Sequence, residues 1–178
     1  MKYFLLPILI IFTFTSCDDG EIIVTTLDFD NQNIELCQTT SSYVFYKVNN
    51  INLETLSFKL QSQNDSLLTT ENTITAQIDP VSNVVNYRSY DASVPQGYFC
   101  SSIPPSSPRI LKDFVSSQGV ATLFTRVVDT TYTGVGIEED TLFVYRTTIT
   151  FNNLRLENQD ETVTQEILEF GSIEVTSE

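Results

Sequence analysis

Apolar and polar residues alternate along much of the chain in short runs. The clearest run covers residues 54–61, where Leu56, Phe58 and Leu60 are separated by polar residues. Because successive side chains of a strand point to opposite faces, this run predicts a strand with one buried and one solvated face. Similar runs predict further strands at residues 22–28, 43–48, 73–78, 84–90, 119–128, 142–151, 165–170 and 173–176. Short strands joined by polar turns predict an all-β fold, an antiparallel β-sandwich of Ig-like, Greek-key type.

One stretch breaks the alternation. Ser107 is a favourable N-cap, and Pro108 is suited to the first position of a helix. The apolar residues that follow are spaced to fall on one face of a helix: Ile110, Leu111, Phe114 and Val115. The pattern therefore predicts one short helix, around residues 108–117, that closes an end of the sandwich.

The first residues of the chain form a separate segment. Lys2 precedes residues 3–14, an apolar stretch of 12 residues that only Pro7 and Thr13 interrupt. A spanning helix needs about 20 apolar residues, so this stretch is too short to cross a bilayer. A basic residue, a short apolar stretch and small residues before a cleavage site are typical of a secretory signal peptide. The sequence thus predicts a signal peptide over residues 1–16.

Residues 14–17 read Phe-Thr-Ser-Cys, and this motif resembles the lipobox of bacterial lipoproteins. The resemblance implies cleavage before Cys17, a lipid on the Cys17 thiol and an acylated new N-terminus. Three acyl chains give stable anchoring, because each buried CH₂ contributes about 0.8 kcal/mol. Phe14 stands where the common lipobox has Leu. The alternative is a plain signal peptide followed by an unmodified cysteine.

Acidic residues follow the cysteine directly, in Asp18-Asp19-Gly20-Glu21. This run resembles the export signal of Bacteroidetes lipoproteins, which implies delivery to the outer face of the outer membrane. In enterobacterial sorting an Asp here would imply retention at the inner membrane, and a third alternative is a solvated tether without sorting information. Residues 17–21 would form the tether, and residues 22–178 a single domain.

The charge balance is strongly acidic. Without the predicted signal peptide, 8 basic and 23 acidic side chains remain, which gives a net charge of −15. Nucleic-acid binding is disfavoured because it requires a basic patch. Electrostatic docking on anionic lipid is disfavoured for the same reason, so membrane contact is expected through the lipid alone.

Residue types that are missing narrow the chemistry further. The chain has no histidine, so neither a Ser-His nor a Cys-His nucleophile can form, and no histidine zinc site is expected. Phosphate-binding glycine motifs are also lacking. A pair of carboxylates could still hydrolyse a glycosidic bond, but 23 acids make chance pairs common. We expect a non-enzymatic protein with no cofactor and no catalytic residue.

After Cys17 is used for lipid attachment, Cys37 and Cys100 remain. An exported compartment is oxidising, so an even pair of cysteines predicts a disulfide bond. The alternative is two buried free thiols.

Two further clusters are candidates for ligand binding. Residues 28–33 partly resemble an EF-hand loop, without its glycine and its final glutamate, and residues 138–140 are also rich in carboxylates. Calcium is therefore a possible ligand, although solvated acidic turns explain both clusters. Tyr87 and Tyr90 could form an exposed patch for glycans, and the alternative is a strand with one buried and one rim tyrosine.

Three triplets resemble the O-glycosylation acceptor of Bacteroidetes, in which Asp precedes Ser or Thr. They would place glycans on Ser66, Thr130 and Thr141, at positions predicted to be turns. Chance and turn composition are the alternative explanation.

These features together predict a bacterial, Bacteroidetes-type lipoprotein anchored to the outer membrane, at the cell surface or else on the periplasmic face. The resemblance covers only residues 1–21 and the three triplets. The leading hypothesis is a surface-displayed protein that binds an unknown protein or glycan partner, or is a component of the envelope. The alternatives are a glycan- or calcium-binding accessory protein and a carboxylate-based hydrolase.

Overall fold

The computed structural model describes residues 27–39, 41–62, 64–101, 103, 105–133 and 140–177 of the 178-residue chain. The predicted signal peptide, Cys17 and the tether lie outside these residues. The predicted strand at residues 22–28 lies mostly outside them too, and residues 27 and 28 are not in a strand. No helix in the described ranges is long and apolar enough to cross a membrane.

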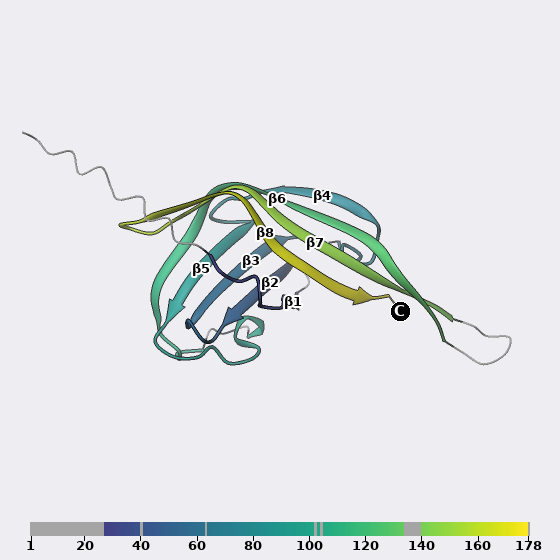
Figure 1. The fold of residues 1–178 in the computed structure, drawn as a ribbon, viewed down its shortest axis with the longest axis horizontal. Coiled ribbons are helices and arrows are strands. Elements are labelled where there is room, and N and C mark those ends of the chain that lie inside the picture. The colour runs from purple at the N-terminus through teal and green to yellow at the C-terminus, as the bar shows by residue number, and fades with distance from the viewer. Residues whose placement is uncertain are drawn as a thin grey trace, which may run out of the picture.

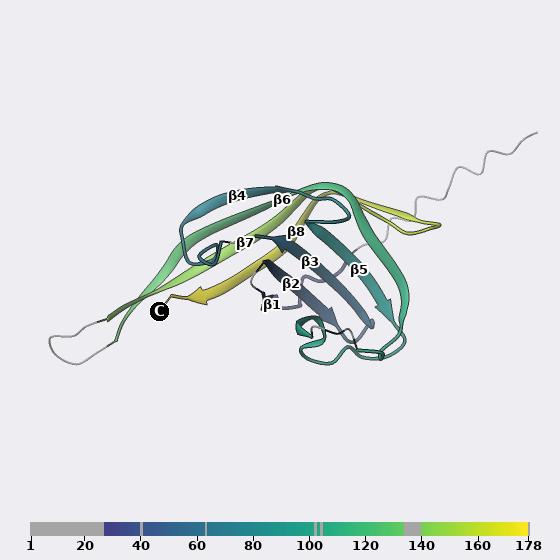
Figure 2. The same ribbon diagram turned by 180° about the vertical axis from the view of Figure 1, so that it is seen from behind.

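The chain folds into eight antiparallel strands that form one curled sheet (Figures 1 and 2). The sheet order is β1-β2-β3-β5-β6-β7-β8, and β4 pairs with a second part of β6. A single 3-10 turn, η1 (Tyr98–Cys100), is the one helical element among the described residues. The strands are β1 (Glu35–Gln38), β2 (Ser42–Asn49), β3 (Glu54–Gln61), β4 (Asn72–Gln77), β5 (Val84–Tyr90), β6 (Ile110–Thr133), β7 (Asp140–Glu157) and β8 (Thr162–Thr176).

The prediction of an all-β, antiparallel fold is confirmed. The two separate sheets of an Ig-like sandwich are not confirmed, because β6 belongs to both halves of one continuous sheet. Its first residues pair with β5, and its later residues pair with β4 on one side and β7 on the other. The long strands β6, β7 and β8 therefore arch over β2, β3 and β5 (Figure 1).

The sheet bends where its long strands contain irregular residues. Gly119 of β6 has φ +143°, and a Cβ added there would lie 3.1 Å from Leu154 Cα. The register between β6 and β7 shifts on both sides of Gln118, and Asn153 of β7 has a positive φ of 50°. Bulges of this kind increase the local twist and bend a sheet. This bend allows one sheet to enclose its own core.

The core fills the concave side of the curled sheet. Phe45 and Phe58 of the β2–β3 half are fully buried, as is Phe151 of β7 opposite them. The rings of Phe58 and Phe151 meet edge to face, with centroids 5.1 Å apart. Phe151 contacts Phe170 of β8 in the same way at 5.5 Å. Aromatic edge-to-face contacts across this space hold the two halves of the sheet together.

The predicted helix around residues 108–117 is wrong, because residues from Ile110 onward belong to β6. Phe114 and Ser116 are buried at alternate positions, whereas Ile110 and Leu111 are 42% and 64% exposed. The spacing of the four apolar residues is compatible both with the period of a helix and with the period of a strand. Pairing with β5, in which Tyr87 lies opposite Phe114, determines the outcome.

Most predicted strands are found, two of them with the predicted bounds, residues 54–61 and 84–90. The predicted strands at 165–170 and 173–176 are parts of β8, which continues through Gly171. Strand β1 was not predicted. Its four residues are too few to show an alternation.

Candidate functional site

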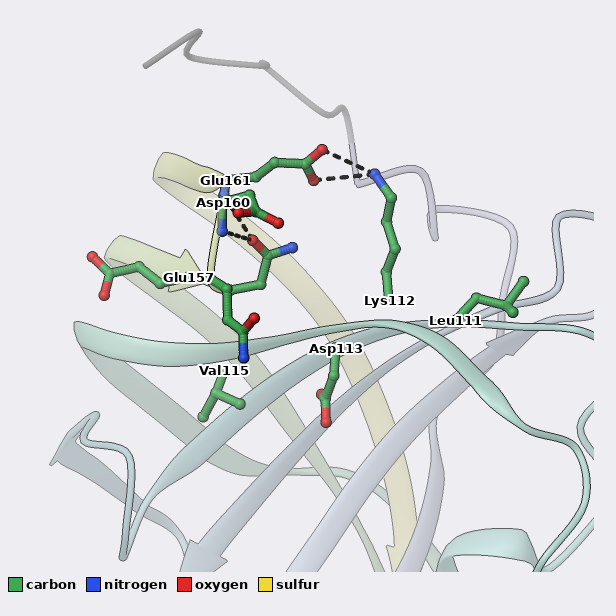
Figure 3. A pocket seen from close by; sticks show the side chains of 9 residues that line it. Leu111, Lys112, Asp113, Val115, Glu157, Asp160 and Glu161 are labelled. Carbon is green, nitrogen blue, oxygen red and sulfur yellow. Dashed lines mark hydrogen bonds and ion pairs between the residues drawn. The ribbon is translucent and has the colours of Figure 1, made fainter. Parts of the chain in front are cut away.

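A hollow of about 610 Å³ lies where the β7–β8 hairpin ends beside the first residues of β6 (Figure 3). The β6 side is formed by Leu111, Lys112, Asp113 and Val115. The other side is the hairpin turn, with Glu157, Asn158, Gln159, Asp160 and Glu161. Asn158 orders this turn, because its Oδ1 accepts hydrogen bonds from the backbone N–H groups of Asp160 and Glu161 at 2.8 and 2.7 Å.

Three of the four carboxylates around the hollow are paired with basic side chains. Asp113 accepts two hydrogen bonds from Arg88, at 2.8 and 3.1 Å. Burial alone would lower the pKa of Arg88, but the hydrogen bond to Asp113 and its charge raise that pKa overall. Glu161 is held by Lys112 at 3.1 Å, and Glu157 by Arg155. In the described part of the chain, the Asp160 carboxylate has no hydrogen bond or ion pair.

This pairing decides which chemistry the hollow favours. Glycoside hydrolysis needs one carboxylic acid that stays protonated beside a second carboxylate. Asp113, Glu157 and Glu161 are instead each occupied by an ion pair with a basic side chain. The arrangement is better suited to contact a polar or cationic ligand than to transfer protons.

The backbone of β6 beside the hollow is paired on one side only. Pairing with β7 begins at Val115, which lies opposite Glu157. The residues before Val115 pair only with β5, where Arg88 lies opposite Asp113 and Tyr90 opposite Ile110. Within the described ranges, residues 110–114 thus form an open strand edge along the hollow.

A second notable region is the outer, convex side of β2, β3 and β5. The connection between β5 and β6 folds back over it (Figure 2). We call residues 94–101 of this connection the strap. Its Val94 is 3% exposed, and both the N–H and the carbonyl of Val94 are hydrogen-bonded to the side chain of Asn50.

Aromatic rings fill the space between the strap and the sheet. Tyr46 of β2 lies against Phe99, with ring centroids 4.7 Å apart, and Tyr90 of β5 lies against Tyr98 at 5.7 Å. Tyr46 also donates a hydrogen bond to Glu35 at 2.7 Å. Burial, followed by this hydrogen bond, raises the pKa of Tyr46, and burial likewise raises the pKa of Tyr90.

The two cysteines join the strap to the sheet. Cys37 of β1 and Cys100 of the strap lie at disulfide distance, with Cα atoms 5.3 Å apart and a sequence separation of 63. This pairing agrees with the sequence-based prediction. The alternative of two buried thiols is not supported, because Cys100 is exposed.

The strap corrects the predicted faces of β3. Leu56, Phe58 and Leu60 are buried as expected. On the face predicted to be solvated, Thr55 is 0% and Ser57 is 5% exposed. Both lie on the side that the strap covers, and Thr55 donates a hydrogen bond to the Tyr90 hydroxyl at 3.3 Å.

The suggested aromatic patch around Arg88 is wrong. Tyr87 and Tyr90 are 6% and 1% exposed. They point to opposite sides of β5, since Tyr87 belongs to the main core and Tyr90 contacts the strap residue Tyr98. Neither can serve as a glycan platform. The alternative of one buried and one rim tyrosine is also wrong, because both are buried.

Lys47 is a buried charged residue that the alternation places in the core. It follows Tyr43 and Phe45 at the next inward position of β2 and is 4% exposed. Its amine donates a hydrogen bond to the Phe29 carbonyl at 2.9 Å and lies 5.7 Å from the centre of the Phe170 ring. No ion pair with Lys47 is formed among the described residues. Burial lowers its pKa, so its charge costs stability at neutral pH, and that cost decreases as pH rises toward 10.5.

The three predicted glycosylation residues lie in different settings. Ser66 is exposed in a turn, and its hydroxyl is bonded to Asn64 Oδ1 at 2.9 Å. Thr130 and Thr141 are in strands β6 and β7 rather than in turns, which corrects that part of the prediction. Thr141 is exposed and Thr130 half-buried. They lie two register positions apart on neighbouring strands, because Thr130 pairs with Phe143 and Tyr132 with Thr141.

The two calcium candidates receive no support from the described residues. Asp28, Asn31 and Gln32 line a separate hollow of about 240 Å³ with residues of the β2–β3 turn. No group of three or more Asp, Glu, Cys or His side chains that could hold a metal ion occurs in the described ranges. Glu138 and Glu139 of the second candidate lie outside those ranges.

Sequence reasoning missed the residues that matter most at the hollow and in the core. The burial of Lys47 could have been predicted, because this lysine stands at an inward position of an alternating run. The open edge at residues 110–114 could not have been predicted, because it depends on where β7 ends relative to β6. Comparison with models of protein families, with curated proteins and with solved structures finds no match to this chain.

Proposed function

We propose that this chain is an exported, lipid-anchored, non-enzymatic protein of the bacterial envelope that binds a partner at the cell surface. The observation that carries the proposal is the segment that ends in Phe14-Thr15-Ser16-Cys17, an apolar stretch followed by a lipobox-like motif. A lipid on Cys17 would hold the protein at the outer membrane.

Two features of the folded domain support export. Cysteines at disulfide distance suit an oxidising compartment, which the cytosol is not. The net charge of −15 that remains without residues 1–16 keeps the domain soluble and repels an anionic membrane surface, so a lipid is the form of membrane attachment that fits. Nine residues lie between Cys17 and Leu27, so even a fully extended chain would keep Leu27 within about 35 Å of the anchor.

The anchor is tested by replacing Cys17. Cys17→Ala is expected to move the protein from the membrane fraction to the soluble exported fraction. Cys37→Ala is the matched control, because it also removes one cysteine but leaves the lipobox unchanged. Membrane association of the Cys17→Ala protein equal to that of the control would contradict the proposal.

We also propose that the Bacteroidetes-type resemblance extends to O-glycosylation of Ser66, Thr130 and Thr141. Ser66 supports this best, because it is an exposed turn residue. Intact mass spectrometry of protein from its native cells is expected to lose the mass of one glycan with Ser66→Ala. A mass that falls only by the one oxygen atom of the hydroxyl would contradict glycosylation at this residue.

A further inference from the structure

The open edge of β6 is the starting point. Residues 110–114 are hydrogen-bonded to β5 on one side, and β7 ends before it reaches their other side. In an antiparallel sheet, alternate residues direct their N–H and C=O groups to each side. An extended chain placed beside residues 110–114 would therefore find unpaired backbone groups. Such edges are ready templates for strand addition.

The hollow provides room for such a chain. Its volume of about 610 Å³ lies directly along this edge, between β6 and the turn of the β7–β8 hairpin (Figure 3). Two large apolar side chains at the edge are exposed, Ile110 at 42% and Leu111 at 64%. In strand addition, backbone hydrogen bonds give affinity and contacts with alternate side chains give selectivity.

The usual protection of an edge is weak here. Natural edges are often guarded by a lysine that projects from the strand into solvent. Lys112 is in the right place, but its amine is bound to both carboxylate oxygens of Glu161 at 3.1 Å. Figure 3 shows Lys112 and Asp113 leaving opposite faces of β6. The lysine is therefore tied to Glu161 of the hairpin turn and does not project freely from the edge into solvent.

The charges indicate what kind of chain would fit. Four carboxylates and one ammonium group line the hollow. Arg88 and Arg155 balance Asp113 and Glu157, and Lys112 balances Glu161, which leaves Asp160 uncompensated among the described residues. A second copy of this chain is a poor occupant, because each copy without residues 1–16 carries a net charge of −15. A cationic segment would be attracted both by Asp160 and by the whole domain.

We propose that residues 110–114 of β6 bind an extended, basic peptide segment of a partner protein, which adds to the sheet as a strand within this hollow. This inference deepens the proposed binding role and names the class of partner. It does not depend on the lipid anchor. Failure of the peptide experiment would leave the Cys17 result unaffected, and failure of the anchor test would leave peptide binding unaffected.

The probe is a fluorescent nine-residue peptide of alternating lysine and valine. The mature protein, purified from membranes in detergent, is titrated against it and binding is followed by anisotropy. Two control peptides separate the two parts of the proposal: one has glutamate in place of lysine, and the other is N-methylated at alternate residues. Only the unmodified lysine peptide is expected to bind, and hydrogen exchange is expected to slow at those amides of residues 110–114 that point away from β5.

A matched pair of variants tests the charge. Asp160→Asn is expected to weaken binding of the lysine peptide about two- to fivefold, which is the range for one exposed ion pair. Asp65→Asn removes the same charge from the exposed β3–β4 connection and is expected to change binding less. Equal effects of the two variants would overturn the role of Asp160.

Three results would overturn the strand-addition proposal itself. The first is no binding of the lysine peptide at concentrations up to about 1 mM, where even weak recognition is measurable. The second is equal binding of the N-methylated peptide, which cannot form the backbone ladder. The third is exchange protection at residues other than 110–114.

Discussion

The convex side of the sheet has two regions that differ in what covers them. Over β2, β3 and β5, the strap and its aromatic rings exclude water, and Thr55 is 0% exposed. Over β6, β7 and β8, the outward residues include Phe124, which is 46% exposed, and polar residues such as Thr148 and Ser172, whose hydroxyls are bonded to each other at 2.9 Å. Arg146 and Glu174 form an ion pair on the same side. The alternation of residues is similar in both regions, but only one of them is covered.

The difference shows that alternation determines which side chains share a face of the sheet. It does not determine whether another segment of the chain covers that face. The cover over β3 comes from a strap about 40 residues further along the chain, and it is held by the Cys37–Cys100 pair. A stability measurement can therefore distinguish the two regions, because equal substitutions should have unequal effects.

The largest expected effect comes from removing the cysteine pair. For a sequence separation of 63 between the cysteines, the chain-entropy model gives about 4 kcal/mol of stabilisation. The double variant Cys37→Ala, Cys100→Ala should lose about that much in denaturant unfolding, and hydrogen exchange should increase first in the strap. Wild-type protein in a reducing agent is the control and should behave similarly. Unchanged stability of both samples would show that the strap does not depend on this pair.

A smaller effect is expected from the tyrosines beneath the strap as pH rises. Burial and the hydrogen bond to Glu35 raise the pKa of Tyr46 above its ordinary value of 10.0. The folded state then keeps a proton that the unfolded state loses, so stability is complete below pH 10 and falls above it. The loss reaches at most about 1.4 kcal/mol per pH unit for each such tyrosine.

Tyr46→Phe should remove the part of the decrease in stability at high pH that Tyr46 causes. The measurement is the unfolding free energy between pH 9 and 11. Tyr132→Phe is the matched control, because Tyr132 is 70% exposed on β6. If the two variants flatten the pH dependence equally, the strap does not shield Tyr46.

The smallest effects compare one substitution in both regions. Thr55→Val should cost about 1 kcal/mol, because it removes a buried hydroxyl that is bonded to Tyr90. Thr148→Val on the open region should change stability by less than about 0.5 kcal/mol, as surface substitutions usually do. Urea unfolding of both variants provides the comparison. Equal values would contradict the assignment of one covered and one open region.

Much of the strand pattern could be predicted from local sequence, and the exceptions have physical causes. Residues 54–61 and 84–90 are strands with the predicted bounds, because their alternation matches their pairing. The helix predicted around residues 108–117 is wrong. The spacing of Ile110, Leu111, Phe114 and Val115 is compatible with a helix and with a strand, and pairing with β5 determines which one forms. The curl depends on Gly119 and Asn153, whose positive φ angles no hydrophobic pattern reveals.

The candidate site was less predictable than the fold. The cysteine pairing followed from counting, because only two cysteines remain after Cys17. The hollow and the open edge of β6 arise from the difference in length between neighbouring strands, which is a property of the tertiary register. The burial of Tyr90 likewise depends on the tertiary structure, because the strap folds back and places Tyr98 against it.

Protease treatment of intact cells tests the central claim, export to the cell surface, most directly. An antibody to the folded domain reports the protein, and a periplasmic protein serves as the control. The account predicts that the domain signal is lost while the periplasmic control survives. Survival of the signal in intact cells, followed by its loss once the outer membrane is opened, would contradict surface display and place the domain in the periplasm.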